Sequence, residues 1–86
     1  MTTPAHVHFA NLCRRVRRCY PRFWFAKRFG LNGRALQDLE QGRALPSRAL
    51  VVLLKAIELD RTFMERVAKE AAADLALLEQ ARVSRN

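Results

Sequence analysis

The sequence has 86 residues, half of them hydrophobic, and carries a net charge of +8 at pH 7. A chain of this length forms one domain, residues 1–86, which buries roughly 60 to 65% of its unfolded surface and would gain stability from dimerisation. No apolar run reaches the length of a membrane span, and the N-terminus lacks the order of a signal peptide. We therefore expect a cytoplasmic protein.

The positive charge is unevenly distributed along the chain. Residues 1–48 contain ten Arg and Lys residues against two acidic ones, whereas residues 49–86 contain six of each kind. A basic half beside a neutral half is typical of a polyanion-binding face with a separate packing or assembly face. Nucleic acid is the commonest such polyanion.

A first helix is predicted after a loose start at residues 1–4. Apolar residues then recur at helical spacing up to Pro21, which cannot continue the helix: Val7, Phe9, Leu12, Val16 and Cys19 or Tyr20. The opposite face carries four arginines, Arg14, Arg15, Arg17 and Arg18. Such a face is either solvated surface or a contact for phosphates.

The cysteines and histidines near the N-terminus do not predict a metal site. Cys13 and Cys19 lie on different faces of the expected helix, so we expect two reduced, partly buried thiols. These two residues, with His6 and His8, lack the paired spacing of zinc ligands. No nucleophile has an evident histidine base, so the sequence predicts no enzyme and no cofactor.

Residues 22–41 predict two short helices joined by a tight turn. Phe25, Ala26 and Phe29 share one face of the first helix, which Pro21 allows to begin at Arg22. Gly30 then ends this helix in a left-handed conformation, which glycine adopts at little cost. The small side chain of Ala26 lets a second helix cross closely.

The second helix of this pair carries its own start signal and apolar face. Asn32 can cap it, and Leu36 and Leu39 turn toward the same interior. With Ala26 and Gly30, this arrangement resembles the helix-turn-helix of the Cro and lambda-repressor (Xre-type) family of DNA-binding proteins. The resemblance continues through residues 39–43 and Pro46 and covers about half of the chain. The alternative is an ordinary pair of packed helices, which needs the same few residues.

The resemblance implies an all-α domain of about five helices. It also indicates which residues would contact the bases of DNA. In this family the first turns of the second helix enter the major groove, where the outward positions are Asn32, Gly33, Arg34, Gln37 and Asp38. Arg34 can donate two bonds to guanine, and Gln37 can pair with adenine. Gly33 would let the backbone approach DNA. Asp38 would either orient Arg34 or accept from cytosine, and we expect Glu40 to support the structure through a basic partner.

Five arginines are predicted to contact DNA phosphates: Arg14, Arg18, Arg22, Arg43 and Arg48. Arg22 stands where the family commonly has a glutamine that meets the DNA backbone. Phe23 and Trp24 are large for positions that this family leaves to solvent. We interpret them as an extension of the core, against the first helix or a partner subunit.

Two further helices complete the expected domain. Ser47 can cap the first of them, which turns inward Leu50, Leu53, Leu54 and Ile57. Asp60 can cap the last, residues 60–82, whose coiled-coil spacing predicts a homodimer seam formed by Met64, Ala68, Ala71, Leu75 and Leu78. The alternative is that its first half packs on the core and the remainder frays.

The function that we expect is a sequence-specific transcriptional regulator, a dimeric repressor that binds a palindromic operator in double-stranded DNA. The resembling family includes phage repressors, plasmid repressors of the KorC type and antitoxins of the HigA type. One alternative is therefore an antitoxin that covers a toxin protein and regulates its own promoter. A third reading is a basic module for RNA or a membrane surface, using residues 14–18 without sequence preference.

Overall fold

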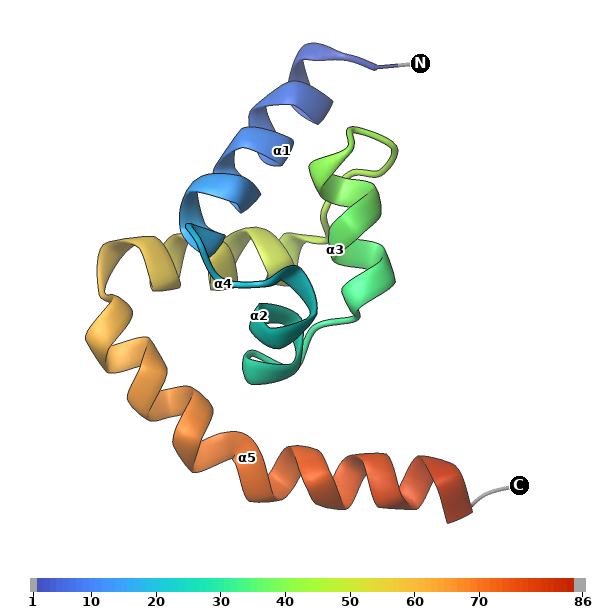
Figure 1. Ribbon diagram of the computed structural model, residues 1–86, viewed down its shortest axis with the longest axis vertical. Coiled ribbons are helices and arrows are strands. Elements are labelled where there is room, and N and C mark those ends of the chain that lie inside the picture. Colours follow the sequence, from blue (N-terminus) through green and yellow to red (C-terminus); the bar gives the residue numbers. More distant parts are fainter. Residues whose placement is uncertain (1, 85–86) are drawn as a thin grey trace.

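Five helices make up the computed structural model, which describes residues 2–84 (Figure 1). In chain order they are α1 (Pro4–Arg17), α2 (Arg22–Arg28), α3 (Gly33–Glu40), α4 (Arg48–Leu59) and α5 (Arg61–Ser84). The described residues contain no strand. The predicted all-α class, the five helices and the long C-terminal helix are thus confirmed. No helix in this part of the chain is both long and apolar enough to cross a membrane.

Three of the predicted caps are present. The side-chain oxygen of Asn32 accepts from the backbone N–H groups of Arg34 and Ala35 at the start of α3. Ser47 Oγ accepts from the N–H of Leu50 at 3.1 Å, and so begins α4. Asp60 alone separates α4 from α5, and its carboxylate caps α5 through the N–H of Phe63, also at 3.1 Å. Each cap satisfies an amide that has no partner within its helix.

The first helix differs from the prediction at both ends. It begins at Pro4, because Thr3 and His6 form a capping box in which each side chain accepts from the other residue's N–H. It ends at Arg17, because Arg18 takes a left-handed φ of 58°. Cys19 and Tyr20 therefore leave the helical face and are exposed, so the expectation that they extend the apolar stripe is wrong.

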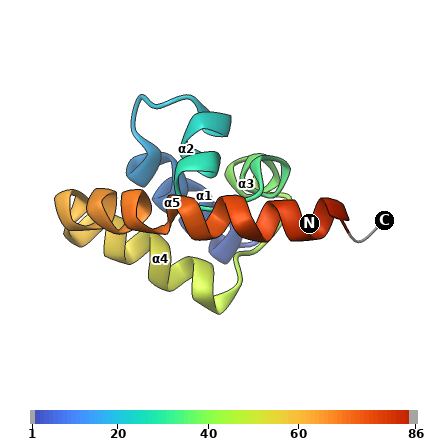
Figure 2. The ribbon, with the colours of Figure 1, turned by 90° about the horizontal axis from the view of Figure 1, so that it is seen from below.

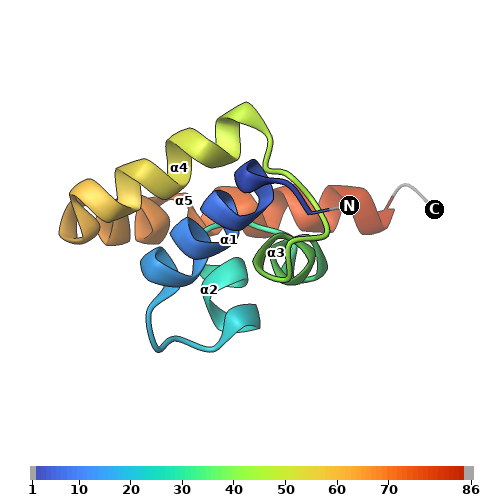
Figure 3. The same ribbon diagram turned by 90° about the horizontal axis from the view of Figure 1, so that it is seen from above.

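The core lies where α1, α2, α3 and α4 meet. It contains the predicted inward residues of the α2–α3 pair and of α4 together with one face of α1: Leu12, Cys13, Val16, Phe25, Ala26, Leu36, Leu39, Leu54 and Ile57. Figure 3 shows α1 between α4 on one side and α2 and α3 on the other. The outward-facing side chains of α2 and α3 do not contribute to this core.

The long α5 leaves α4 at an elbow and curves around the rest of the domain. Figure 1 shows its second half turning under α2 and α3, and Figure 2 shows it crossing in front of the other helices. Met64 packs against the core and Ala68 is buried within the same chain. These two residues of the predicted dimer seam are therefore occupied inside the monomer, which is where the alternative interpretation placed them.

Candidate nucleic-acid interface

The turn between α2 and α3 has the predicted geometry. Gly30 has a φ of +71°, and the N–H of Leu31 donates to the carbonyl of Ala26 at 2.7 Å. A Cβ atom on Gly30 would lie 3.2 Å from a methyl carbon of Leu75 in α5. The left-handed backbone favours glycine here, and a larger residue would also require the Leu75 side chain to shift by a few tenths of an ångström. The turn fixes the start of α3 relative to α2.

Asn32, Arg34 and Gln37, three of the five residues predicted to read bases, lie at the start and in the middle of α3. The side-chain oxygen of Asn32 accepts the hydrogen bonds of the helix cap, and its side-chain NH2 group takes no part in the cap. Arg34 is exposed, and no ion pair or side-chain hydrogen bond is recorded for it within residues 2–84. Gln37 is half-buried on the same helix. Arg34 is thus the residue of α3 best placed to donate to a ligand.

Asp38 pairs with Arg43 and not with Arg34. Arg43 Nη2 lies 2.7 Å from Asp38 Oδ1, and its Nε lies 3.2 Å from the same oxygen. The prediction that Asp38 orients Arg34 is therefore wrong. The reason is the end of α3, where the chain reverses after Gly42 (φ +75°) and returns Arg43 over the last turn. This pairing reduces the repulsion that Asp38 would exert on a phosphate.

Phe23 and Trp24 remain on the surface of the monomer, so the expectation that they pack against the first helix is wrong, and the contact with a partner subunit stays a prediction. Their side chains are 64% and 47% exposed. The Trp24 ring stacks on Tyr20 with centroids 4.9 Å apart. Phe23 lies against Gly33, where an added Cβ would be 2.2 Å from the Phe23 ring. The sequence predicted that DNA would approach the backbone closely at Gly33. The Phe23 ring fills the space beside this residue.

Glu40, at the end of α3, is a buried anion surrounded by arginines. Its side chain is 1% exposed and accepts from Arg17 Nε at 2.7 Å and from Arg17 Nη2 at 2.8 Å. Arg22 approaches the same carboxylate at 3.3 Å, and Arg14 donates to the Glu40 backbone carbonyl. Burial by itself raises the pKa of Glu40, but Arg17 and Arg22 outweigh burial and hold the pKa below its ordinary value. The expected structural role of Glu40 is confirmed.

Cys13 lies beside this anion. Its thiol donates to Glu40 Oε2 at 3.6 Å, and burial together with the Glu40 charge raises the pKa of the thiol to about 12. Cys19 is exposed, so the prediction of partial burial is wrong for both cysteines: one is fully buried and the other is not. No group of three His, Cys, Asp or Glu side chains within residues 2–84 is arranged to hold a metal ion.

The predicted phosphate contacts fall into two groups. Arg14 and Arg22 converge on the end of α3 through Glu40, and Arg43 reaches the same helix through Asp38. Arg18 and Arg48 are exposed. Arg17, which the sequence placed only on the arginine face of the first helix, is the main partner of Glu40. The signal for it was the acid at the end of α3, which needs a cation once it is buried.

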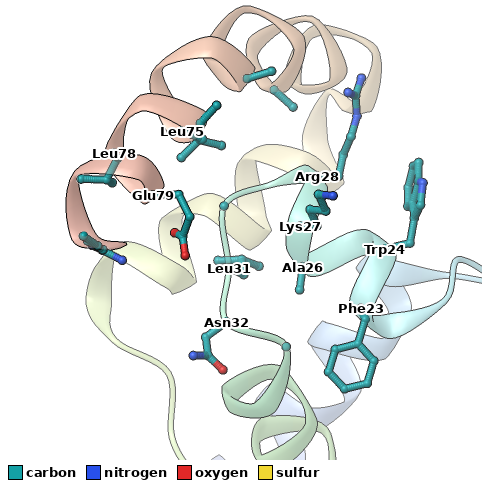
Figure 4. Close-up of a pocket in the computed structure, with 16 residues that line it drawn as sticks. Phe23, Trp24, Ala26, Lys27, Arg28, Leu31, Asn32, Leu75, Leu78 and Glu79 are labelled. Carbon is teal, nitrogen blue, oxygen red and sulfur yellow. The ribbon is translucent and has the colours of Figure 1, made fainter. Parts of the chain in front are cut away.

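Two hollows flank α5. The outer one contains Phe63, Val67 and Ala71, with Arg66, Lys69, Glu70 and Asp74 around them. The inner one is a groove of about 990 Å³ between α5 and the α2–α3 turn (Figure 4). Leu75 and Leu78 of the predicted seam line this inner groove, whereas Ala71 lines the outer hollow. The structure therefore does not place the five predicted seam residues on one free face.

Comparison of the chain with protein families, with characterised proteins and with solved structures finds no match. The assignment of a function therefore depends on the α2–α3 pair and its surroundings.

Proposed function

We propose that the protein is a sequence-specific, double-stranded DNA-binding transcriptional regulator of the Cro and lambda-repressor type. The observation that carries this proposal is Arg34, an exposed arginine in the first turn of a helix that is anchored at both ends. Asn32 caps the start of α3, and the buried Glu40 ties its end to α1 and α2. A rigidly held helix with a free guanidinium at its start is suited to reading a base edge.

In the proposed complex, α3 lies in the major groove with its first turn against the bases. Arg34 donates to guanine O6 and N7, and Gln37 pairs with adenine. Arg18 and Arg48, which are exposed, contact phosphates, and Arg22 and Arg43 keep donors beyond those held by Glu40 and Asp38. The excess charge of residues 1–48 would supply salt-dependent affinity, and α3 would supply sequence preference.

We propose that the active species is a homodimer joined through the outer hollow of α5. Phe63 and Val67 stand one helical turn apart and are 52% and 39% exposed. Arg66 and Lys69 lie beside Glu70 and Asp74, so a two-fold antiparallel contact would place opposite charges together. Such a dimer presents two copies of α3 to a palindromic operator, and occupancy of a promoter by it would repress transcription in the cytoplasm.

The test is a titration of the full chain against the DNA upstream of its own gene and against a scrambled duplex of equal length. At two salt concentrations, we expect a preference of about 10³-fold or more for the upstream DNA, with two chains per site. Equal, strongly salt-dependent binding to both duplexes would overturn the proposal, because the basic half would then act only as a polyanion face.

A second candidate function is an antitoxin that binds a toxin protein and regulates its own promoter. The exposed rings of Phe23 and Trp24 favour it, since large aromatics on a surface are enriched at protein interfaces. A neighbouring gene for a small toxic protein, neutralised by co-expression of this chain, would select the antitoxin. Neutralisation that survives Trp24→Ala and Phe23→Ala together would contradict the role of these rings.

A further inference from the structure

The inner groove is bounded by α5 on one side and by α2, the turn and the start of α3 on the other (Figure 4). We infer that this groove binds an acidic amphipathic helix of a second protein, and that such a helix displaces the chain from DNA. The binding step is independent of the function proposed above. The displacement step rests on it.

The shape and lining of the groove fit a helix. Along α5 the groove extends from Ala68 to Arg82, which is about 21 Å of helix at 1.5 Å per residue. Ala72 and Ala76 present small side chains one turn apart, while Leu75 and Leu78 supply apolar surface. The small and apolar side chains along this length of α5, with Leu75 against the turn at Gly30, fit the apolar face of a helix with anchors at i, i+3 or i+4, and i+7.

The charges around the groove favour an acidic occupant. Lys27 and Arg82 line it and are exposed, and no ion pair is recorded for either within the described residues. Arg28 also lines it, with its charge shared by Glu65 at 2.8 Å. Glu79 is the only acid in the lining that the structure describes. Glutamates flanking an apolar stripe would therefore be attracted to both walls, whereas lysines would be repelled.

The position of the groove links its occupancy to DNA. Asn32 and Gly33, at the start of α3, form part of its wall, and Phe23 stands against Gly33. A helix bound in the groove would cover the start of α3, which the proposed complex inserts into the major groove. Because the two ligands need the same surface, they would exclude each other, and each would weaken the binding of the other.

The first experiment measures the binding of a peptide to the groove in the absence of DNA. Trp24 is the single tryptophan of the chain and lines the groove, so its emission reports occupancy. The probe is a capped helical peptide of about 14 residues, with leucines at i, i+3 and i+7 and glutamates on both flanks. We expect a saturable shift of Trp24 emission, and binding at least about tenfold weaker for the same peptide with lysines in place of the glutamates.

Two alanines of α5 provide matched variants. Ala76 lines the groove and Ala73 lies outside both hollows, and both are exposed. Ala76→Gln should weaken the acidic peptide about tenfold or more, while Ala73→Gln should leave its affinity within about twofold. Because both substitutions place the same side chain on the same helix, a general effect on folding would change both.

Three results would overturn the inference: unchanged Trp24 emission, equal affinity for the acidic and basic peptides, or equal effects of Ala76→Gln and Ala73→Gln. A change of emission with protein concentration alone, abolished by Ala76→Gln, would also overturn it, because the occupant would then be a second copy of this chain.

The second experiment adds the acidic peptide to the chain bound to labelled upstream DNA. Release of the DNA from the parent protein but not from the Ala76→Gln variant is expected. Simultaneous binding of peptide and DNA would overturn the displacement step. If the chain binds no DNA at all, the proposed function fails, and the Trp24 titration still decides the occupant of the groove.

Discussion

Arg17 of α1 holds the buried carboxylate of Glu40, at the end of α3, through two hydrogen bonds of 2.7 and 2.8 Å. Arg22 of α2 approaches the same carboxylate, so three helices meet on one negative charge. The angle between the α2–α3 pair and α1 therefore depends on an ion cluster as well as on apolar packing. Removal of the charge would leave two cations facing each other at the edge of the core.

The Glu40→Gln variant is expected to lose about 3 kcal/mol of unfolding free energy at pH 7, because an amide cannot neutralise two arginines. Urea unfolding followed by circular dichroism measures this loss. Glu79→Gln, an exposed change on α5, should stay within about 0.5 kcal/mol of the parent. Equal midpoints for the parent and the Glu40→Gln variant would show that the cluster contributes no stability.

The same carboxylate gives the stability a defined dependence on pH. The pKa of Glu40 is lower in the folded state than its ordinary value of 4.5. Its contribution is therefore complete above that ordinary value and is lost as the pH falls through the lower pKa of the folded state. We expect the stability of the parent to fall more steeply below pH 4.5 than that of the Glu40→Gln variant. Parallel pH profiles would contradict this assignment.

The two cysteines should differ sharply in reactivity. In the native protein a disulfide reagent should modify Cys19, which is exposed, and leave Cys13, which is buried and has a pKa raised to about 12. Mass spectrometry should find one modified thiol before unfolding and two after. The Cys19→Ser variant should show none in the native state. Rapid modification of Cys13 in that variant would mean that the core around Glu40 opens readily.

Arg18 has a strained backbone, and its side chain is proposed to contact a DNA phosphate. Its φ of 58° with a ψ of −132° suits glycine, so Arg18→Gly should be more stable than Arg18→Ala by about 1 kcal/mol or more. At Arg15, inside α1, the order should reverse, because glycine weakens a helix by about 1 kcal/mol relative to alanine. Thermal unfolding of the four variants tests this. The same order at both positions would refute the left-handed conformation of Arg18.

Substitutions of Arg34 and Arg48 should distinguish base reading from phosphate contact. Arg34→Ala should cost about 1 to 3 kcal/mol on the upstream DNA and relax the preference at one base pair. Arg48→Ala should weaken all duplexes alike and lower the salt dependence of binding. Binding to a set of singly substituted operators measures both effects. If Arg34→Ala leaves the preference unchanged, α3 does not read bases in the proposed way.

Most of the secondary structure could be predicted because its signals are local. Asn32, Ser47 and Asp60 each cap a helix that follows within a few residues, and Gly30 ends α2 in the conformation that only glycine adopts cheaply. The inward faces of α2, α3 and α4 follow from helical periodicity. The capping box of Thr3 and His6 was missed because its histidine stands where the usual motif has Glu or Gln.

Local signals along the chain were enough to predict the five helices, the apolar faces of α2, α3 and α4, and the basic character of residues 1–48. Three features became visible only once the helices were packed together: Arg17 is the main partner of Glu40, Asp38 pairs with Arg43, and Met64 and Ala68 are buried inside the monomer. Partners such as Arg17 and Glu40 lie on different helices, so they depend on how those helices are packed. The groove beside Asn32 likewise exists only because α5 curves back under the turn between α2 and α3 (Figure 1).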